Sequence, residues 1–182
     1  MMSSIRAFEM KKYLLMPAAM LVSSCLPLTV AQAADSTIIT IKANIVASPC
    51  TVDTTQLDID LGEIQADTLA VAGATSPWSS PSQIHLSHCP ATTQGVQATF
   101  SGTPATNGDA NGYKNVGAGG DASISVQLQG ANSTYLSNGH KTGFMLVTNN
   151  SVDFPVQARL YTSAAANPGL VAATVTVTFE YE

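Results

Sequence analysis

The chain has 182 residues, of which 45% are apolar and only 10% are charged, and its formal net charge is −5. Disorder needs low hydrophobicity and high net charge, so this composition excludes a disordered chain and fits a single domain with a leader. Seven Lys and Arg against twelve Asp and Glu leave no basic patch for phosphates, which argues against a nucleic-acid partner.

The N-terminal residues have the three parts of a secretory signal peptide. Arg6, Lys11 and Lys12 form a basic start, residues 13–30 are mostly apolar, and residues 31–33 place alanines at alternate positions. This pattern predicts a signal peptide over 1–33 with cleavage after Ala33. The alternative is a lipoprotein box at residues 22–25, in which Cys25 becomes the acylated N-terminus.

Removal of this leader leaves two cysteines, Cys50 and Cys89. Exported proteins meet an oxidising compartment, so we expect the two to form a disulfide. Closing a loop of about 40 residues stabilises a fold by about 4 kcal/mol in the chain-entropy model. The alternative is a pair of buried free thiols.

Period-two alternation of apolar and polar residues dominates the rest of the chain and predicts strands buried on one face. Seven segments show it, at residues 39–45, 57–61, 84–86, 96–100, 124–128, 152–160 and 171–181. Stretches rich in Ser, Pro, Gly and Asn separate several of them, at residues 76–81, 103–120 and 167–169. Short strands at such spacing predict an all-β sandwich in one domain.

The two ends of this region carry most information. Residues 34–48 form a strand-like segment before Cys50, and the last alternating segment continues to the C-terminal residues. A self-sufficient sandwich places its terminal strands in its own sheets. A spare apolar strand and an unfilled groove are instead expected of a protein that exchanges strands with neighbours.

Several motifs match a known family. Four segments carry the match: Ala34-Asp35-Ser36-Thr37-Ile38, Ser48-Pro49-Cys50-Thr51-Val52, Ile84-His85-Leu86-Ser87-His88-Cys89-Pro90 and Phe154-Pro155-Val156-Gln157-Ala158-Arg159. On these residues the chain resembles the pilins of the chaperone–usher pathway, particularly the minor tip subunits of type 1 fimbriae. Within that family, residues 74–78 and 113–115 are most similar to the adaptor directly behind the tip adhesin.

The C-terminal residues resemble the family's chaperone-recognition pattern. Gly169 is fourteenth from the C-terminus, Tyr181 is the penultimate residue, and Val175, Val177 and Phe179 alternate between them. The resemblance implies that these five residues form the strand contacted by a periplasmic chaperone and border the groove.

The resemblance also implies the fold and its assembly. It implies an all-β, incomplete immunoglobulin-like β-sandwich over residues 49–182 that lacks its last strand, completed by a donor strand from a neighbouring subunit. Residues 34–48 are then the donor-strand extension, with Ile39, Ile41, Ala43 and Ile45 pointing into the neighbour's groove. Ala43 stands where family donor strands usually carry Gly, and a slip of one residue would turn every side chain to the other face.

The implied function is that of a structural subunit of type 1-like fimbriae, a minor tip adaptor that links the adhesin to the rod. Its partners are then the periplasmic chaperone, the outer-membrane usher and neighbouring subunits, on a path through the periplasm to the extracellular fimbrium. The alternatives are the major rod subunit and, less favoured because one domain leaves no room for a lectin domain, a carbohydrate-binding adhesin.

No cofactor, metal or catalytic site is expected. His85 and His88 face opposite sides of a strand, which disfavours a metal cluster with Cys89. No nucleophile elbow accompanies the serines and histidines, so the chain is not expected to be an enzyme. Residues 109–112 lack the remaining ligands of a calcium loop and are predicted to be a solvated turn. Trp78 is predicted to pack against the domain in preference to facing a partner.

Overall fold

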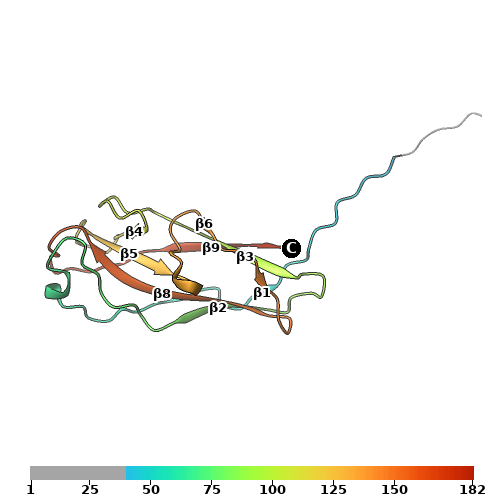
Figure 1. The fold of residues 1–182 in the computed structure, drawn as a ribbon, viewed down its shortest axis with the longest axis horizontal. Helices are drawn as coiled ribbons and strands as arrows, with labels where there is room; N and C mark the ends of the chain where they lie inside the picture. The colour runs from blue at the N-terminus through green and yellow to red at the C-terminus, as the bar shows by residue number, and fades with distance from the viewer. Residues whose placement is uncertain (1–39) are drawn as a thin grey trace, which may run out of the picture. The chain divides into compact units, whose positions relative to one another are not determined.

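Antiparallel strands are the main regular secondary structure of residues 40–182, the part of the chain that the computed structural model describes (Figure 1). The helical turns in this part are two short 3₁₀ segments, η1 (Ala66–Leu69) and η2 (Ala131–Ser133). None of the described helices is long and apolar enough to cross a membrane. The predicted signal peptide lies outside the described residues.

The first sheet has five strands in the order β1-β2-β8-β5-β4. Their bounds are β1 (Thr51–Val52), β2 (Ser82–Ser87), β4 (Gly112–Lys114), β5 (Ile124–Gln129) and β8 (Val152–Thr162). All neighbouring pairs are antiparallel, and Ile84 of β2 lies opposite Phe154 of β8. The long β8 is therefore the centre of this sheet.

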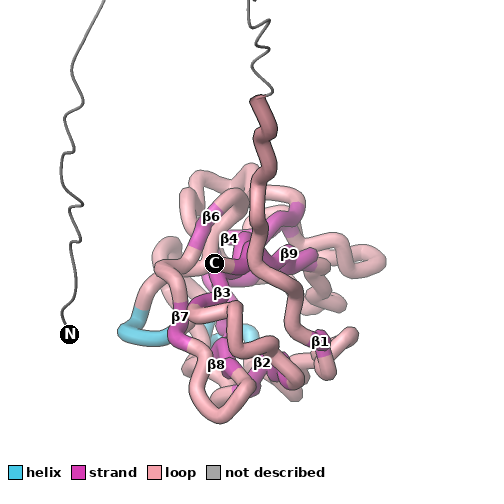
Figure 2. Tube along the Cα trace, turned by 90° about the vertical axis from the view of Figure 1, so that its right-hand side faces the viewer, coloured by secondary structure: helices cyan, strands magenta, loops and turns pink. Residues whose placement is uncertain are grey.

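The second sheet is built around β3 (Gly95–Gly102). Along one edge β3 pairs with β9 (Val175–Tyr181), from Val96 opposite Tyr181 to Gly102 opposite Val175. Along the other edge it pairs with the two-residue strands β6 (His140–Lys141) and β7 (Met145–Leu146). Figure 2, seen from the end of the domain, shows β2 and β8 below β3 and β9.

The core lies between the two sheets. Alternate residues of β8 are buried, and they pack with inward residues of β2 and β3 in one cluster: Ile84, Leu86, Val96, Ala98, Phe100, Val152, Phe154, Val156 and Ala158. Tyr113 is also fully buried, and its hydroxyl donates a 2.7 Å hydrogen bond to the carbonyl of Leu136. Burial raises the pKa of Tyr113 to about 12.

The predicted disulfide is present. Cys50 and Cys89 are bonded, and both are buried in the core cluster. The bond ties the residue before β1 to a residue just after β2, two segments that also pair as strands. The confirmed pairing therefore anchors the start of the domain.

Five of the seven alternating segments form strands where the sequence predicts them, as β2, β3, β5, β8 and β9. Residues 57–61 alternate equally well but have no strand partner in the described chain, and residues 40–45 likewise carry no strand. A period-two pattern predicts which face is apolar, but a strand also requires a neighbour for its hydrogen bonds. In the opposite sense, β4 forms within residues 103–120, which composition predicts to be turn.

The prediction of a solvated turn at residues 109–112 is wrong for Asp109. Its side chain is buried on the outer face of the first sheet, and its carboxylate accepts hydrogen bonds from Ser125 Oγ at 2.7 Å and Gln127 Nε2 at 3.0 Å. Gly112 passes so close that a Cβ there would overlap this carboxylate. A buried carboxylate needs such donors, and this one has them.

Trp78 packs on the same outer face, as predicted. The guanidinium of Arg159 lies 4.4 Å from the centre of the Trp78 ring, within the range of a cation–π contact. Arg159 also donates to Gln127 Oε1 at 2.8 Å and to the Tyr135 hydroxyl at 2.7 Å. The loop that carries Trp78 is thereby fastened to β8.

Candidate functional site: an open strand position

A long groove of about 1180 Å³ opens into the core between β9 and the extended residues 55–61. Its floor is apolar and comes from both sheets: Ile84, Phe100, Ile124, Val126, Leu128, Val156, Ala158 and Leu160. Residues 166–177 line one wall, and residues 55–62 and 64–66 line the other. The hydrophobic core is therefore reachable from solvent along this side.

Unpaired backbone borders the groove on both sides. β9 is hydrogen-bonded to β3 along one edge, and within the described chain no strand pairs with its other edge. Residues 56–61 make no backbone hydrogen bond to any other described segment. Two free edges facing one apolar groove leave the position of a single strand open between them.

The side chains on these walls are only half buried. Val175 and Val177 of β9 line the groove, and Leu57, Ile59 and Leu61 pack against the core from the opposite wall while keeping partial exposure. An intruding apolar strand would remove these side chains from water, which is a favourable change of about 25 cal/mol per Å² buried.

Four of the five predicted chaperone-strand residues lie on one face of β9, and two of them, Val175 and Val177, line the groove. Val175, Val177, Phe179 and Tyr181 share the inward face of β9, and the rings of Phe179 and Phe154 lie 5.7 Å apart. Burial raises the pKa of Tyr181. Gly169 lies on the same wall before β9 begins and is exposed.

The predicted donor residues are exposed where the structure describes them. Ile41 is 86% exposed and Ile45 is 95% exposed, with Ala43 exposed between them. Ile39 lies outside the described residues. Large aliphatic side chains left in water in a regular alternation are suited to burial in a partner.

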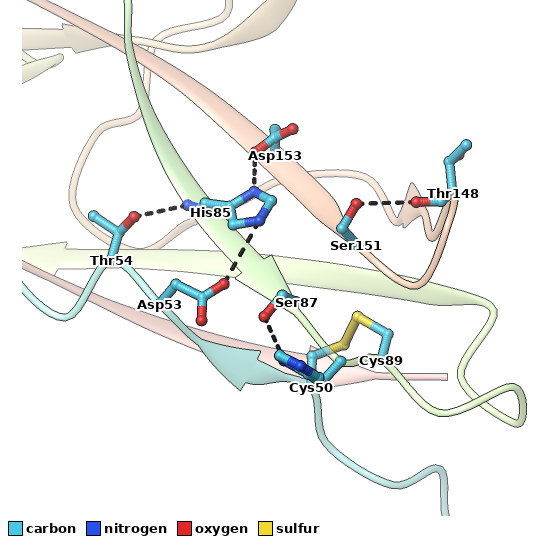
Figure 3. A network of polar contacts seen from close by, with 10 residues as sticks. Cys50, Asp53, Thr54, His85, Ser87, Cys89, Thr148, Ser151 and Asp153 are labelled. Atoms are coloured by element: carbon cyan, nitrogen blue, oxygen red, sulfur yellow. Dashed lines mark hydrogen bonds and ion pairs between the residues drawn. A yellow bond between two sulfur atoms is a disulfide. The ribbon is translucent and has the colours of Figure 1, made fainter.

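A polar cluster fixes the start of the wall at residues 55–61 (Figure 3). The Nδ1 of His85 lies 2.6 Å from the carboxylate of Asp153, and its Nε2 lies 3.6 Å from the carboxylate of Asp53. The backbone N–H of His85 donates to Thr54 Oγ1 at 3.0 Å. The hydrogen bond to Asp153, together with the charges of both carboxylates, raises the pKa of His85 above its usual 6.5.

Sequence reasoning missed the groove floor and one of its walls. Val126 and Ala158 read as ordinary core residues, and the alternation at residues 57–61 predicts a strand without indicating that its partner is absent. A signal was available in the acidic residues Asp58 and Asp60, which mark the exposed face of that segment.

Comparison with known proteins agrees with this geometry. The model of the family described as "Fimbrial protein" matches residues 39–182. Protein FimG of Escherichia coli K12 is 37% identical over 152 residues, which cover 82% of this chain and 87% of that protein. The crystal structure of the P pilus rod subunit PapA superposes with a TM-score of 0.63 at 21% identity, covering 74% of this chain and all of that one. A subunit in a chaperone–usher pilus structure superposes with a TM-score of 0.59 at 18% identity, covering 82% and 98%.

The sandwich with one strand position open, its disulfide and these structural neighbours define an immunoglobulin-like pilin domain, as the sequence predicts. The chain belongs to the fimbrial protein family. It is a fimbrial subunit, and the relatives that it matches are fimbrial proteins, which fits the expectation of a chain without enzymatic activity.

Proposed function

We propose that this chain is a minor tip adaptor of type 1-like fimbriae, joined to its neighbours by exchange of strands. The observation that carries the proposal is the apolar groove bordered by two unpaired backbone edges. A neighbour's extension fills this groove, and residues 34–48 of this chain fill the groove of the next subunit toward the tip. Ile39, Ile41, Ala43 and Ile45 are the side chains donated.

The magnitudes support such a joint. Three Ile-sized side chains contribute about 5–9 kcal/mol when buried, at about 1.5–3 kcal/mol each. A strand between two free edges adds on the order of ten ladder hydrogen bonds, each worth about 0.5–1.5 kcal/mol before the extension is ordered. Because donor and acceptor surfaces differ, the contact is head-to-tail and builds an open fibre.

A subunit with an empty groove exposes its core and two free edges, which favour aggregation. We propose that after export and removal of residues 1–33 a periplasmic chaperone occupies the groove and contacts β9, including Tyr181 and the preceding Gly169. At the outer-membrane usher, the extension of a neighbour then replaces the chaperone, and the subunit becomes part of the extracellular fimbrium.

Deletion of residues 34–46 tests the donor role. The truncated subunit should still be captured by the chaperone, because its groove is intact, but should not join its tip-side neighbour. Co-purification of the two subunits measures this. A truncated chain that still joins that neighbour contradicts the proposal.

The position in the fibre is tested separately. The similarity to FimG supports the adaptor over the alternative, a major rod subunit. Electron microscopy of fimbriae labelled on this subunit should show label at the tip alone. Label along the whole shaft identifies the rod subunit. A purified subunit that binds a glycan array would instead indicate an adhesin.

A further inference from the structure

The groove wall on the β9 side is hydrogen-bonded to β3 over only part of its length. From Val175 to Val177 the wall is the start of β9, which is hydrogen-bonded to β3 along its length. Residues 166–174 continue the same wall past Gly102, the last residue of β3, and are in no strand. This end of the wall therefore needs a different support.

The loop of residues 115–121, which follows β4, provides it through side chains. The Oδ2 atom of Asp121 accepts hydrogen bonds from the backbone N–H of Asn167 at 2.7 Å and from its Nδ2 at 3.0 Å. The Oδ1 atom of Asn115 accepts from the backbone N–H of Ala172 at 3.1 Å. The backbone N–H of Val116 donates to the carbonyl of Ala172 at 2.8 Å.

The 115–121 loop is itself tightly organised against the wall. Asn115 Oδ1 also accepts from the N–H of Gly117 at 2.9 Å, and Asp121 Oδ1 accepts from the N–H of Ser123 at 2.8 Å. A Cβ at Gly117 or Gly120 would overlap the carbonyl oxygen of Leu170, so glycine permits this close approach. The hydrogen bonds from Asn167 and Ser123 lower the pKa of Asp121 to about 2, so its carboxylate is charged at neutral pH.

The opposite wall at this end is formed by Ile64, Gln65 and Leu69. The two walls are joined by one hydrogen bond, from the N–H of Ala166 to the carbonyl of Leu69 at 3.0 Å. Beyond that bond, the spacing of the walls depends on how residues 167–172 are held. Asp121 and Asn115 hold both ends of that stretch.

We propose that Asp121 and Asn115 are positioning residues that keep residues 167–172 in place to receive one end of the incoming strand. The inference rests on the proposed strand uptake and assigns these two residues to a single end of the groove. The occupant is an extended segment of another fimbrial subunit with alternating apolar side chains. β3 supports the rest of the wall, so loss of either side chain should weaken binding at that end alone.

Peptide binding to the chaperone-bound subunit tests this. The probes are a synthetic peptide of residues 34–48, which stands in for a neighbour's extension because it has the alternating apolar side chains of the proposed occupant, and two shortened forms, residues 34–43 and 39–48. Asp121→Ala should weaken binding of the 34–48 peptide about three- to tenfold, the effect of losing about one ordinary hydrogen bond. Of the shortened forms, the one that does not reach residues 167–172 should bind the wild type and the variant equally.

Two further variants sharpen the result. Asn167→Ala removes only the side-chain bond to Asp121, so it should give a smaller loss with the same dependence on the peptide, even if Asp121→Ala folds poorly. Asp67→Ala is the matched control, because Asp67 is exposed and does not line the groove; it should change nothing.

The outcomes separate the two proposals. An equal loss for all three peptides, or no loss for any, overturns the positioning role while the strand uptake stands. A wild-type subunit that takes up none of the peptides overturns the proposed strand uptake and the positioning role together.

Discussion

At the scale of single residues, several polar side chains in this domain hold neighbouring segments together through hydrogen bonds. Asp109 holds β5 from the outer face of the first sheet, His85 joins two acidic side chains beside the disulfide, and Asp121 holds the groove wall. Each replaces or supplements a strand hydrogen bond where the backbone ladder is missing or short. Of these three side chains, Asp121 acts on the groove wall itself.

The His85 cluster should make stability depend on pH. The folded-state pKa of His85 is raised above 6.5 by its hydrogen bond to Asp153, so its stabilising effect is fully present below 6.5 and is lost as the pH rises through the folded value. His85→Gln should therefore lower the melting temperature more at about pH 5.5 than at about pH 9. Thermal unfolding of the two proteins at both pH values measures this, and an equal loss at both would contradict it.

Asp109 should contribute strongly to stability. Asp109→Ala leaves the hydroxyl of Ser125 and the amide of Gln127 buried without their acceptor, and unsatisfied buried donors cost about 1–3 kcal/mol. Denaturant unfolding of the strand-filled subunit gives the change in free energy. The exposed Asp67→Ala should stay within about 0.5 kcal/mol of the wild type. A comparably small effect for Asp109→Ala would show that Ser125 and Gln127 find other partners.

At the scale of elements, alternation predicts the strands whose partners lie within the chain. It succeeds for β8, where every second residue is buried, because burial on one face is what the pattern encodes. It misses β4, which has only three residues and pairs through its place beside β5. It wrongly predicts a strand at residues 57–61, because an extended segment without a neighbour has the same sequence pattern as a paired strand.

The candidate site also has parts that the sequence predicts and parts that it does not. The disulfide and the inward face of β9 follow from local sequence features and compartment chemistry. The contact between Asp121 and Asn167 joins residues 46 positions apart, and nothing in either local pattern indicates it. Side-chain contacts between loops depend on the finished packing of the sandwich, so only the structure reveals them.

β9 should be the element on which chaperone capture depends. Tyr181→Ala removes a half-buried ring from the inward face of β9 and should weaken capture severalfold, with a lower periplasmic yield. Pull-down with the chaperone measures it. Thr178→Ala is a suitable control, because Thr178 points outward on the same strand. Unchanged capture of Tyr181→Ala would remove this residue from the proposed chaperone contact.

At the scale of the whole molecule, the apolar composition and low charge have a specific use. Part of the apolar surface lines the open groove, and another part belongs to the exposed side chains of Ile41 and Ile45. Both parts stay accessible to solvent in the single chain. The chain therefore carries a core that is incomplete by one strand. The proposed fibre follows from repeating this incomplete unit head to tail.

The most direct test completes the sandwich within one chain. A second copy of residues 36–46, which has the alternating apolar side chains of the proposed occupant, is joined after Glu182 through a short turn to stand in for a neighbour's strand. The control carries Ser in place of Ile39, Ile41 and Ile45 of the added copy. Burial of three Ile-sized side chains, about 5–9 kcal/mol, should raise the guanidinium midpoint by about 1–2 M over the control. Equal midpoints for the two chains would contradict the claim that the groove is the place of a missing strand.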